Sequence, residues 1–212
     1  MIKEYAVQLI VCDNNEEELY KKLCEQYKLL EEVDIVCSTR ISDVSSADVF
    51  VLVGDNDECD IVVESRGIPI VDLRDKKLQH LVKDSIGFDV VRKIIIDGLV
   101  APYLDSLIGL DISEIVNLIG NSKKIYIGIS ASNNAQNTKE LISNVIESVD
   151  VNMSKCSGIY LNISGDIDML QGNEIAKGLQ EAVGQDVNIV WSMIYDAKAP
   201  EDEYYMTVLF ME

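Results

Sequence analysis

The part of the chain from residue 157 onward carries the pattern that most restricts the fold. Side chains alternate in character over residues 157–164, which is the period of a β-strand with one buried face. One side of this strand carries Ile159, Leu161 and Ile163, and the other carries Tyr160, Asn162 and Ser164. Gly165 and Asp166 end the pattern, so we expect a turn there.

A helix and two further strands follow this first strand. Apolar residues then recur three or four positions apart and predict one buried helical stripe that Gly184 ends. The stripe consists of Ile175, Ala176, Leu179, Ala182 and Val183. Two strands are expected at 188–195 and 204–211, joined by the polar turn AKAPEDE. The expected order of elements from residue 157 onward is therefore strand, helix, strand, strand.

The first part of the chain has a different pattern. Short runs rich in valine and isoleucine predict strands that are buried on both faces and pair in parallel. These runs are 5–12, 34–38, 48–53 and 68–73. A helix is expected at 16–27, capped by Asn15, and a short one at 59–65 as a crossover.

The middle of the chain links these two parts. A broad apolar stripe predicts a long helix over about 87–106. Beyond it we expect a short helix at 111–118, a strand at 124–130 and a helix at 136–149. Two helices can then cover one face of a four-stranded sheet. We therefore place the domain boundary near 103–110, which gives domains 1–106 and 107–212.

Charge and cysteine content exclude several classes of function. The chain has 37 acidic and 18 basic residues, a net charge of −19, which disfavours nucleic acid and anionic membranes as partners. Five cysteines without a C-x-x-C spacing argue against a disulfide framework or a zinc site, and a single histidine excludes multi-histidine sites. No apolar run approaches the roughly 18 residues of a membrane helix, and no signal peptide is visible. These features predict a cytoplasmic protein.

Two motifs near the C-terminus resemble the tubulin and FtsZ superfamily. The first is N-I-S-G at Asn162–Gly165, followed by an acidic turn and a helix. The second is a final hairpin made of VNIVWSMIYD, APEDE and YYMTVLFM. The resemblance extends back to about residue 86. It implies an α/β fold with a reduced Rossmann-like parallel-sheet domain, a central helix and a two-layer α+β domain like that of FtsZ.

In the resembled family two glycine-rich loops hold the phosphates of GTP, because glycine lets backbone N–H groups approach an anion. At the matching places this chain has Cys12-Asp-Asn-Asn-Glu16 and Gly54-Asp-Asn-Asp-Glu-Cys-Asp60. Carboxylates near a phosphate would repel it by about 1 kcal/mol per pair even in water. The resemblance therefore implies a relative of the GTPases that binds no GTP, has no cofactor and is not an enzyme.

The family's catalytic loop, N-x-D-x-x-D, matches Gly109, Asp111 and Glu114 here. Two of its carboxylates remain, at degenerate catalytic positions. However, Asp111 followed three residues later by Glu114 is also how a helix with a capping box begins, and we favour that interpretation. The predicted role is then a protein-interaction or assembly-regulating module, whose partner is a filament of this prokaryotic cytoskeletal family or a second copy.

An alternative role uses the acidic loops themselves. Asp55, Asp57 and Asp60 follow a predicted strand, at the edge where open α/β sheets usually place ligands. Together with Asp13 they could bind a hard divalent cation through oxygen atoms, in a metal-binding or enzymatic module. A solvated turn with acidic residues at a helix N-terminus explains the same residues, and we favour that interpretation over the cation site.

Overall fold

The three-dimensional structure is a computed structural model. It describes residues 5–11, 17–25, 33–38, 49–53, 70–72, 97–101, 104, 106–122, 125–132, 138–165, 168–184, 186–194 and 204–212. All statements about the fold concern these residues.

The N-terminal part is a parallel sheet. Its elements are β1 (Tyr5–Val11), α1 (Glu17–Glu25), β2 (Val33–Ser38), β3 (Val49–Val53) and β4 (Ile70–Asp72). Strands β1, β2, β3 and β4 pair in parallel, as the valine- and isoleucine-rich runs predict. Their order in the sheet is β2-β1-β3-β4. Val7, Val11, Phe50 and Val51 are buried, so hydrophobic burial holds this sheet together.

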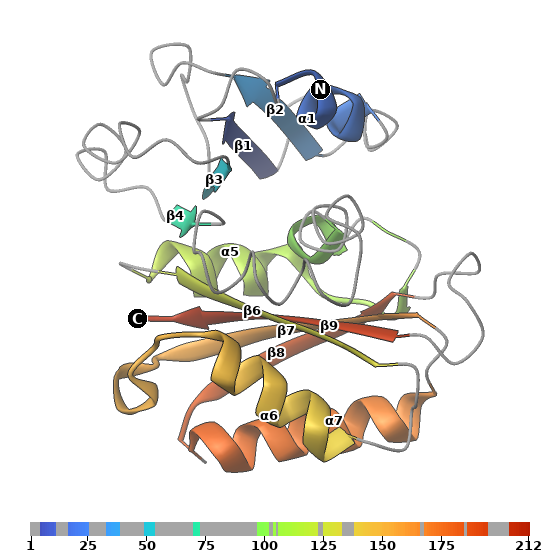
Figure 1. The fold of residues 1–212 in the computed structure, drawn as a ribbon, viewed down its shortest axis with the longest axis vertical. Coiled ribbons are helices and arrows are strands. Elements are labelled where there is room, and N and C mark those ends of the chain that lie inside the picture. Colours follow the sequence, from blue (N-terminus) through green and yellow to red (C-terminus); the bar gives the residue numbers. More distant parts are fainter. Residues whose placement is uncertain are drawn as a thin grey trace.

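The C-terminal part is a mixed sheet between two helical layers. Its elements are β5 (Ser106–Ile108), α5 (Ile112–Gly120), β6 (Ile125–Ser132), α6 (Thr138–Ser148), a 3-10 turn (Met153–Lys155), β7 (Gly158–Gly165), α7 (Met169–Val183), β8 (Asn188–Ile194) and β9 (Tyr204–Met211). In Figure 1, α6 and α7 lie on one side of strands β6 to β9, and α5 lies on the other.

One continuous sheet joins the two parts. The full strand order is β2-β1-β3-β4-β6-β9-β7-β8-β5. The parts are connected through β4 and β6, where Val71 and Ile125 form the one pair of that ladder. Strand β9 runs antiparallel to both β6 and β7, and β7 runs parallel to β8. This arrangement is a mixed α/β fold of the predicted class, and the division at residue 106 stays a prediction.

Strand β7 differs from its prediction, because both of its faces are buried rather than one. Every residue from Gly158 to Gly165 is buried. Ile159 and Leu161 pack in the core cluster with α6 and α7, while Tyr160 packs in the other cluster with Leu99 and Ile115. The reason is that α5 and the helical residues 97–100 cover the face that the sequence pattern left polar.

The central helix ends earlier than predicted. Residues 97–100 are helical and 101 is a 3-10 residue, whereas Ser106–Ile108 form the short strand β5. Proline disfavours helical geometry at the residue before it, so Pro102 explains the end of the helix. The N-terminal part of the predicted helix, 87–96, and the predicted helix at 59–65 lie outside the described residues.

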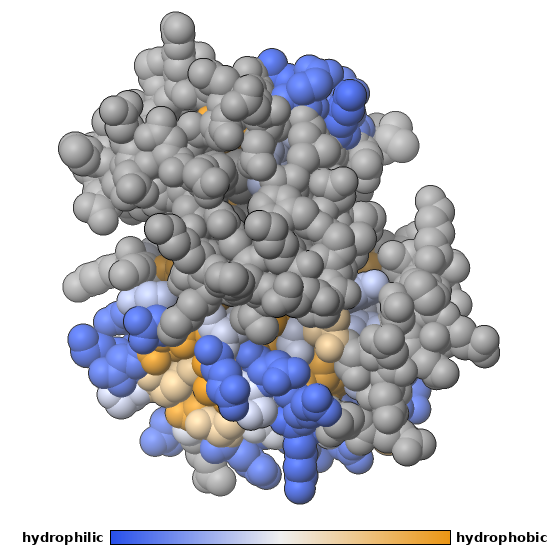
Figure 2. All heavy atoms as spheres, viewed as in Figure 1, coloured by the Kyte–Doolittle hydropathy of each residue, from blue (hydrophilic) through white to orange (hydrophobic). Residues whose placement is uncertain are grey.

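Helix α7 begins earlier than the apolar stripe indicates. Asp168 caps it, accepting hydrogen bonds from the N–H groups of Leu170 and Gln171 at 2.8 and 2.9 Å. The side chain of Gln171 in turn accepts from the Asp168 N–H, which completes a capping box. Figure 2 shows hydrophobic residues, in orange, gathered among hydrophilic ones on the lower part of this face.

Helix α6 lies very close to strand β6 at one glycine. A Cβ atom on Gly128 would stand 3.0 Å from Val145 Cγ1, 3.0 Å from the Val145 carbonyl oxygen and 3.2 Å from Ser148 Oγ. Because backbone cannot move aside as a flexible side chain can, glycine sets the distance between helix and sheet here.

We predict that Gly128→Ala lowers the free energy of unfolding by about 1–3 kcal/mol, since the added methyl group forces α6 away from the sheet. The matched control is Gly120→Ala at the end of α5, where a Cβ would meet no atom within 4 Å. Alanine there should leave stability unchanged or raise it slightly, because it favours helix. Chemical denaturation of both variants measures this, and equal stabilities would contradict the packing argument.

Candidate functional site beside helix α5

Helix α5 is fixed by its cap and by its buried face. The Asp111 side chain accepts a hydrogen bond from the Ser113 N–H at 2.9 Å, which satisfies a free donor of the first turn. Ile115 and Ile119 are buried against the sheet. The hydrogen bonds from the Ser113 N–H and side chain hold the pKa of the exposed Asp111 carboxyl below its ordinary value. The cap predicted for Asp111 is confirmed.

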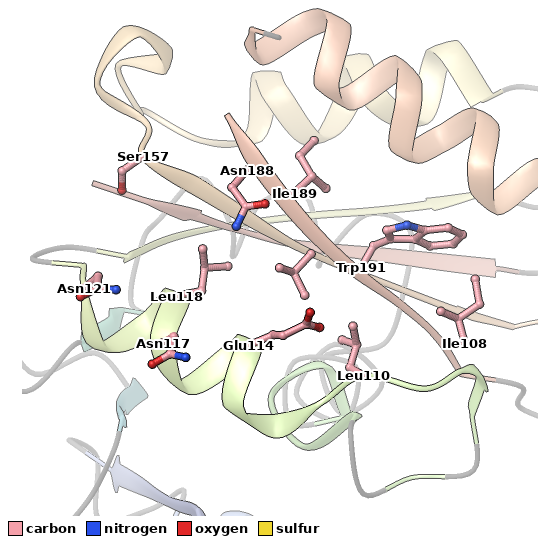
Figure 3. Close-up of a pocket in the computed structure, with 11 residues that line it drawn as sticks. Ile108, Leu110, Glu114, Asn117, Leu118, Asn121, Ser157, Asn188, Ile189 and Trp191 are labelled. Atoms are coloured by element: carbon pink, nitrogen blue, oxygen red, sulfur yellow. The ribbon is translucent and has the colours of Figure 1, made fainter. Parts of the chain in front are cut away.

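Glu114 does not complete the predicted capping box. The structure describes both residues, and the Asp111 cap lacks the reciprocal bond from the Glu114 side chain that the Asp168 cap has. Instead, Figure 3 shows Glu114 pointing from α5 toward β8, with Leu110 and Leu118 on either side. The two carboxylates therefore have separate roles: one caps a helix, and the other lines a cavity.

The cavity between α5 and β8 has a volume of about 720 Å³. Its lining combines apolar side chains, three amides, a hydroxyl and one carboxylate. The lining residues are Ile108, Leu110, Glu114, Asn117, Leu118, Asn121, Ser157, Asn188, Ile189, Val190 and Trp191. This is within the size range of about 300–1,000 Å³ for ligand sites, and the mixed chemistry suits an amphipathic group.

One wall of the cavity is the outer strand of the sheet. Strand β8 pairs with β7 along its full length, from Asn188 to Ile194. On its other side β8 pairs with β5 at Ile194 and Met193 alone. The outer edge of β8 is therefore without a strand neighbour, in the described chain, from Asn188 to Ser192.

A buried polar chain fastens β8 to β7. The Ser192 hydroxyl donates to Asn162 Oδ1 at 2.7 Å and lies 2.9 Å from the Tyr160 hydroxyl. Burial raises the pKa of Tyr160 far above its ordinary value, so its hydroxyl stays protonated and can donate to Ser192. The Asn162 Nδ2, Thr207 Oγ1 and Ser130 Oγ atoms are buried without a hydrogen-bond partner. The polar face that the sequence pattern gave to this strand is thus an internal network, not a solvated surface.

The structure brings together some of the predicted site residues and leaves others undescribed. Asp111 lies just before α5 as its N-cap, and Glu114 lies on the first turn of the helix. Asp55, Asp57, Asp60 and Asp13 lie outside the described residues, so the cation hypothesis is untested. Within the described ranges no three histidine, cysteine, aspartate or glutamate residues gather as metal ligands, and no helix is long and apolar enough to cross a membrane.

Sequence reasoning missed the cavity. Trp191 is partly buried, packs against the core cluster under α6 and α7, and also lines the cavity. Asn117, Asn121 and Asn188 carried no signal of their own, because isolated asparagines are common on surfaces. The available signal was the uncharged run Asn188–Trp191 within a predicted strand.

The chain shares its fold with solved structures of FtsZ and CetZ. Two solved structures of FtsZ from M. jannaschii share it. The W319Y mutant has a TM-score of 0.67 at 17% identity over 93% of this chain and 70% of that one. The dimer titled "empty" has a TM-score of 0.63 at 16% identity over 92% and 67%.

A third similar structure is CetZ from Methanosaeta thermophila, with a TM-score of 0.51 at 13% identity over 99% of this chain and 62% of that one. No protein-family model matches the chain, and no curated protein matches it in sequence. The predicted superfamily fold is therefore confirmed by structure, while the low identities carry no statement about activity.

The cap at Asp111 gives a prediction that tests whether its carboxylate stabilises the fold by capping α5. Asparagine caps helices as well as aspartate does, but alanine does not. We expect Asp111→Ala to lower the thermal midpoint at pH 7 and Asp111→Asn to preserve it.

The pH dependence has a definite sign. Because the folded pKa of Asp111 is lowered, its stabilising effect is complete above the ordinary carboxyl pKa and is lost as pH falls through the folded value. The wild type should therefore lose stability relative to Asp111→Asn between about pH 4 and pH 2. Thermal melts across this range measure the difference, and parallel curves would contradict the assigned cap.

Proposed function

We propose that this chain is a non-enzymatic member of the tubulin/FtsZ fold, without a functional GTP site, that acts in the cytoplasm as a protein-interaction or assembly-regulating module. Its docking surface is the end of the C-terminal sheet where α5, β5 and the start of α7 lie. Its partner is a filament of a protein with the same fold.

The observation that carries this proposal is the separation of the two acidic side chains. Asp111 is engaged with Ser113 as a helix cap, and Glu114 faces an amphipathic cavity beside β8. A hydrolytic pair would need both carboxylates directed at one reacting centre. An exposed helix end beside an amphipathic cavity suits a contact with another protein.

The sequence supports the loss of the nucleotide site. Loops Cys12–Glu16 and Gly54–Asp60 have one glycine and several carboxylates at the places where the resembled family has glycine-rich loops. A triphosphate at this position would be repelled by these groups. Both loops lie outside the described residues.

Exposed apolar side chains support a protein partner at this end. Among the described residues, the large hydrophobic side chains that are exposed are Leu107 (50%), Met169 (59%) and Leu170 (76%). Leu107 lies on β5, which pairs with the C-terminal end of β8, and the other two begin α7 after the parallel neighbour β7. One of the similar FtsZ structures is titled a dimer, so a relative with this fold associates with itself. Grouped exposed apolar residues commonly mark contact sites.

Charge disfavours a filament made of this chain alone. Head-to-tail stacking in the resembled family brings the α5 end toward the nucleotide loops, which here carry Asp55, Asp57 and Asp60. Like charges would face each other, and the net charge of −19 adds repulsion. Docking onto the end of a nucleotide-bearing relative avoids this repulsion.

The proposal predicts that substoichiometric amounts of the chain shorten filaments of an intact FtsZ, because each molecule that docks through its α5 end blocks further addition. Electron microscopy of filaments formed with GTP by the M. jannaschii protein, with and without this chain, measures the length distribution.

A charge reversal on the docking surface provides the matched comparison. Glu114→Lys should reduce the shortening, whereas Glu181→Lys, an equally exposed acidic position on α7 outside the cavity, should not. An unchanged length distribution with the wild-type chain at equimolar amounts would exclude the filament as partner.

A further inference from the structure

We propose that the open edge of β8 and the cavity beside it take up an extended segment of a partner protein as an additional strand, with a lysine or arginine of that segment paired to Glu114. The inference rests on the proposed interaction function and specifies the chemistry of the partner.

The first argument is the geometry of the edge. From Asn188 to Ser192, β8 has β7 on one side and no described strand on the other, while β5 occupies the edge beyond it. In a parallel pair, alternate residues direct their N–H and C=O groups away from the neighbour. Five residues of strand span about 16 Å, long enough for a short added strand beside β5.

Among the described residues, this edge also lacks the usual protection. Natural sheets cover edge strands or place lysine, proline or a bulge there to prevent pairing with other chains. The run Asn188, Ile189, Val190 and Trp191 contains no charge, proline or glycine, and its register with β7 is unbroken. Such an edge is a template for strand addition, a recurring mode of peptide recognition.

The third argument is the space next to the edge. The cavity of about 720 Å³ lies between β8 and α5, on the side where an added strand would direct every second side chain. Leu110, Leu118 and Val190 supply apolar walls. An aliphatic side chain of the segment would be buried there without displacing any element of the fold.

The fourth argument selects the charge of the occupant. Glu114 is the one ionisable side chain of the cavity lining, and within the described chain it forms no hydrogen bond or ion pair. Asn117, Asn121 and Asn188 add neutral amides around it. A cationic side chain is therefore complementary, whereas a second copy of this chain, at −19, would bring mainly acidic groups.

The chain contains its own reporter for the test. Trp191 is the single tryptophan, and it lines the cavity. The probe is a blocked synthetic peptide that alternates valine and threonine around a central lysine, titrated to millimolar concentration. A matched peptide carries glutamate in place of lysine.

We expect saturable change of tryptophan fluorescence with the lysine peptide, at least about tenfold weaker binding of the glutamate peptide, and the reverse order for Glu114→Lys. Glu181→Lys should behave as the wild type. Amide hydrogen exchange should slow at residues 188–191 on binding, which a peptide bound elsewhere would not produce.

Two results would overturn the inference. One is the absence of saturable binding by the lysine peptide to the wild type; the other is binding that does not change with Glu114→Lys or does not protect 188–191. Concentration-dependent dimerisation that protects the same amides without peptide would identify a second copy as the occupant and also refute it. If the chain shortens filaments but does not bind the peptide, this inference is wrong and the proposed function stands. If the peptide binds but filaments are not shortened, the filament is not the partner and this inference stands.

Discussion

The burial of strand β7 on both faces is the constraint on which the C-terminal part of the structure depends. It lies between β9 and β8, and it separates the core cluster under α6 and α7 from the one under α5. Polar side chains on one face are tolerated because Ser192 of the neighbouring strand hydrogen-bonds both Asn162 and Tyr160. Since a buried polar group without a partner costs about 1–3 kcal/mol, this network fixes how β8 sits beside β7.

The position of β8 in turn defines the functional surface. Strand β8 is held by β7, and α5 is held by its cap at Asp111 and by buried Ile115 and Ile119. The cavity is the space that remains between these two rigid elements. Sites on helices and strands are better positioned than sites on loops, so the docking surface that we propose rests on rigid elements.

The sequence predicted most of the secondary structure, because helical and strand periods are local. The final helix, the last two strands, the parallel strands and the cap at Asp111 all follow from residues close together in the chain. The final hairpin expected from the last two strands is wrong, because β7 lies between β9 and β8 in the sheet. What failed depends on distant contacts. The alternation around Asn162 indicated a solvated face, but α5 and residues 97–101 cover it. Strand β5 is three residues long and exists through pairing with Met193 and Ile194, far along the chain.

The cavity could not be predicted for the same reason. It joins Leu110 and Glu114 to Val190 and Trp191, which no local period relates. The resemblance placed Glu114 at a degenerate catalytic position, and the capping-box spacing predicted a structural role for it. In the structure it instead faces β8, a result that only the folded arrangement of the two elements determines.

We propose that this chain, which has the fold of FtsZ, acts through its surface and not through a nucleotide. Calorimetric titration with GTP and Mg²⁺, using M. jannaschii FtsZ as the positive control, tests it most directly. The account predicts no saturable heat up to millimolar GTP and no phosphate release. One-to-one binding at micromolar concentration would contradict it.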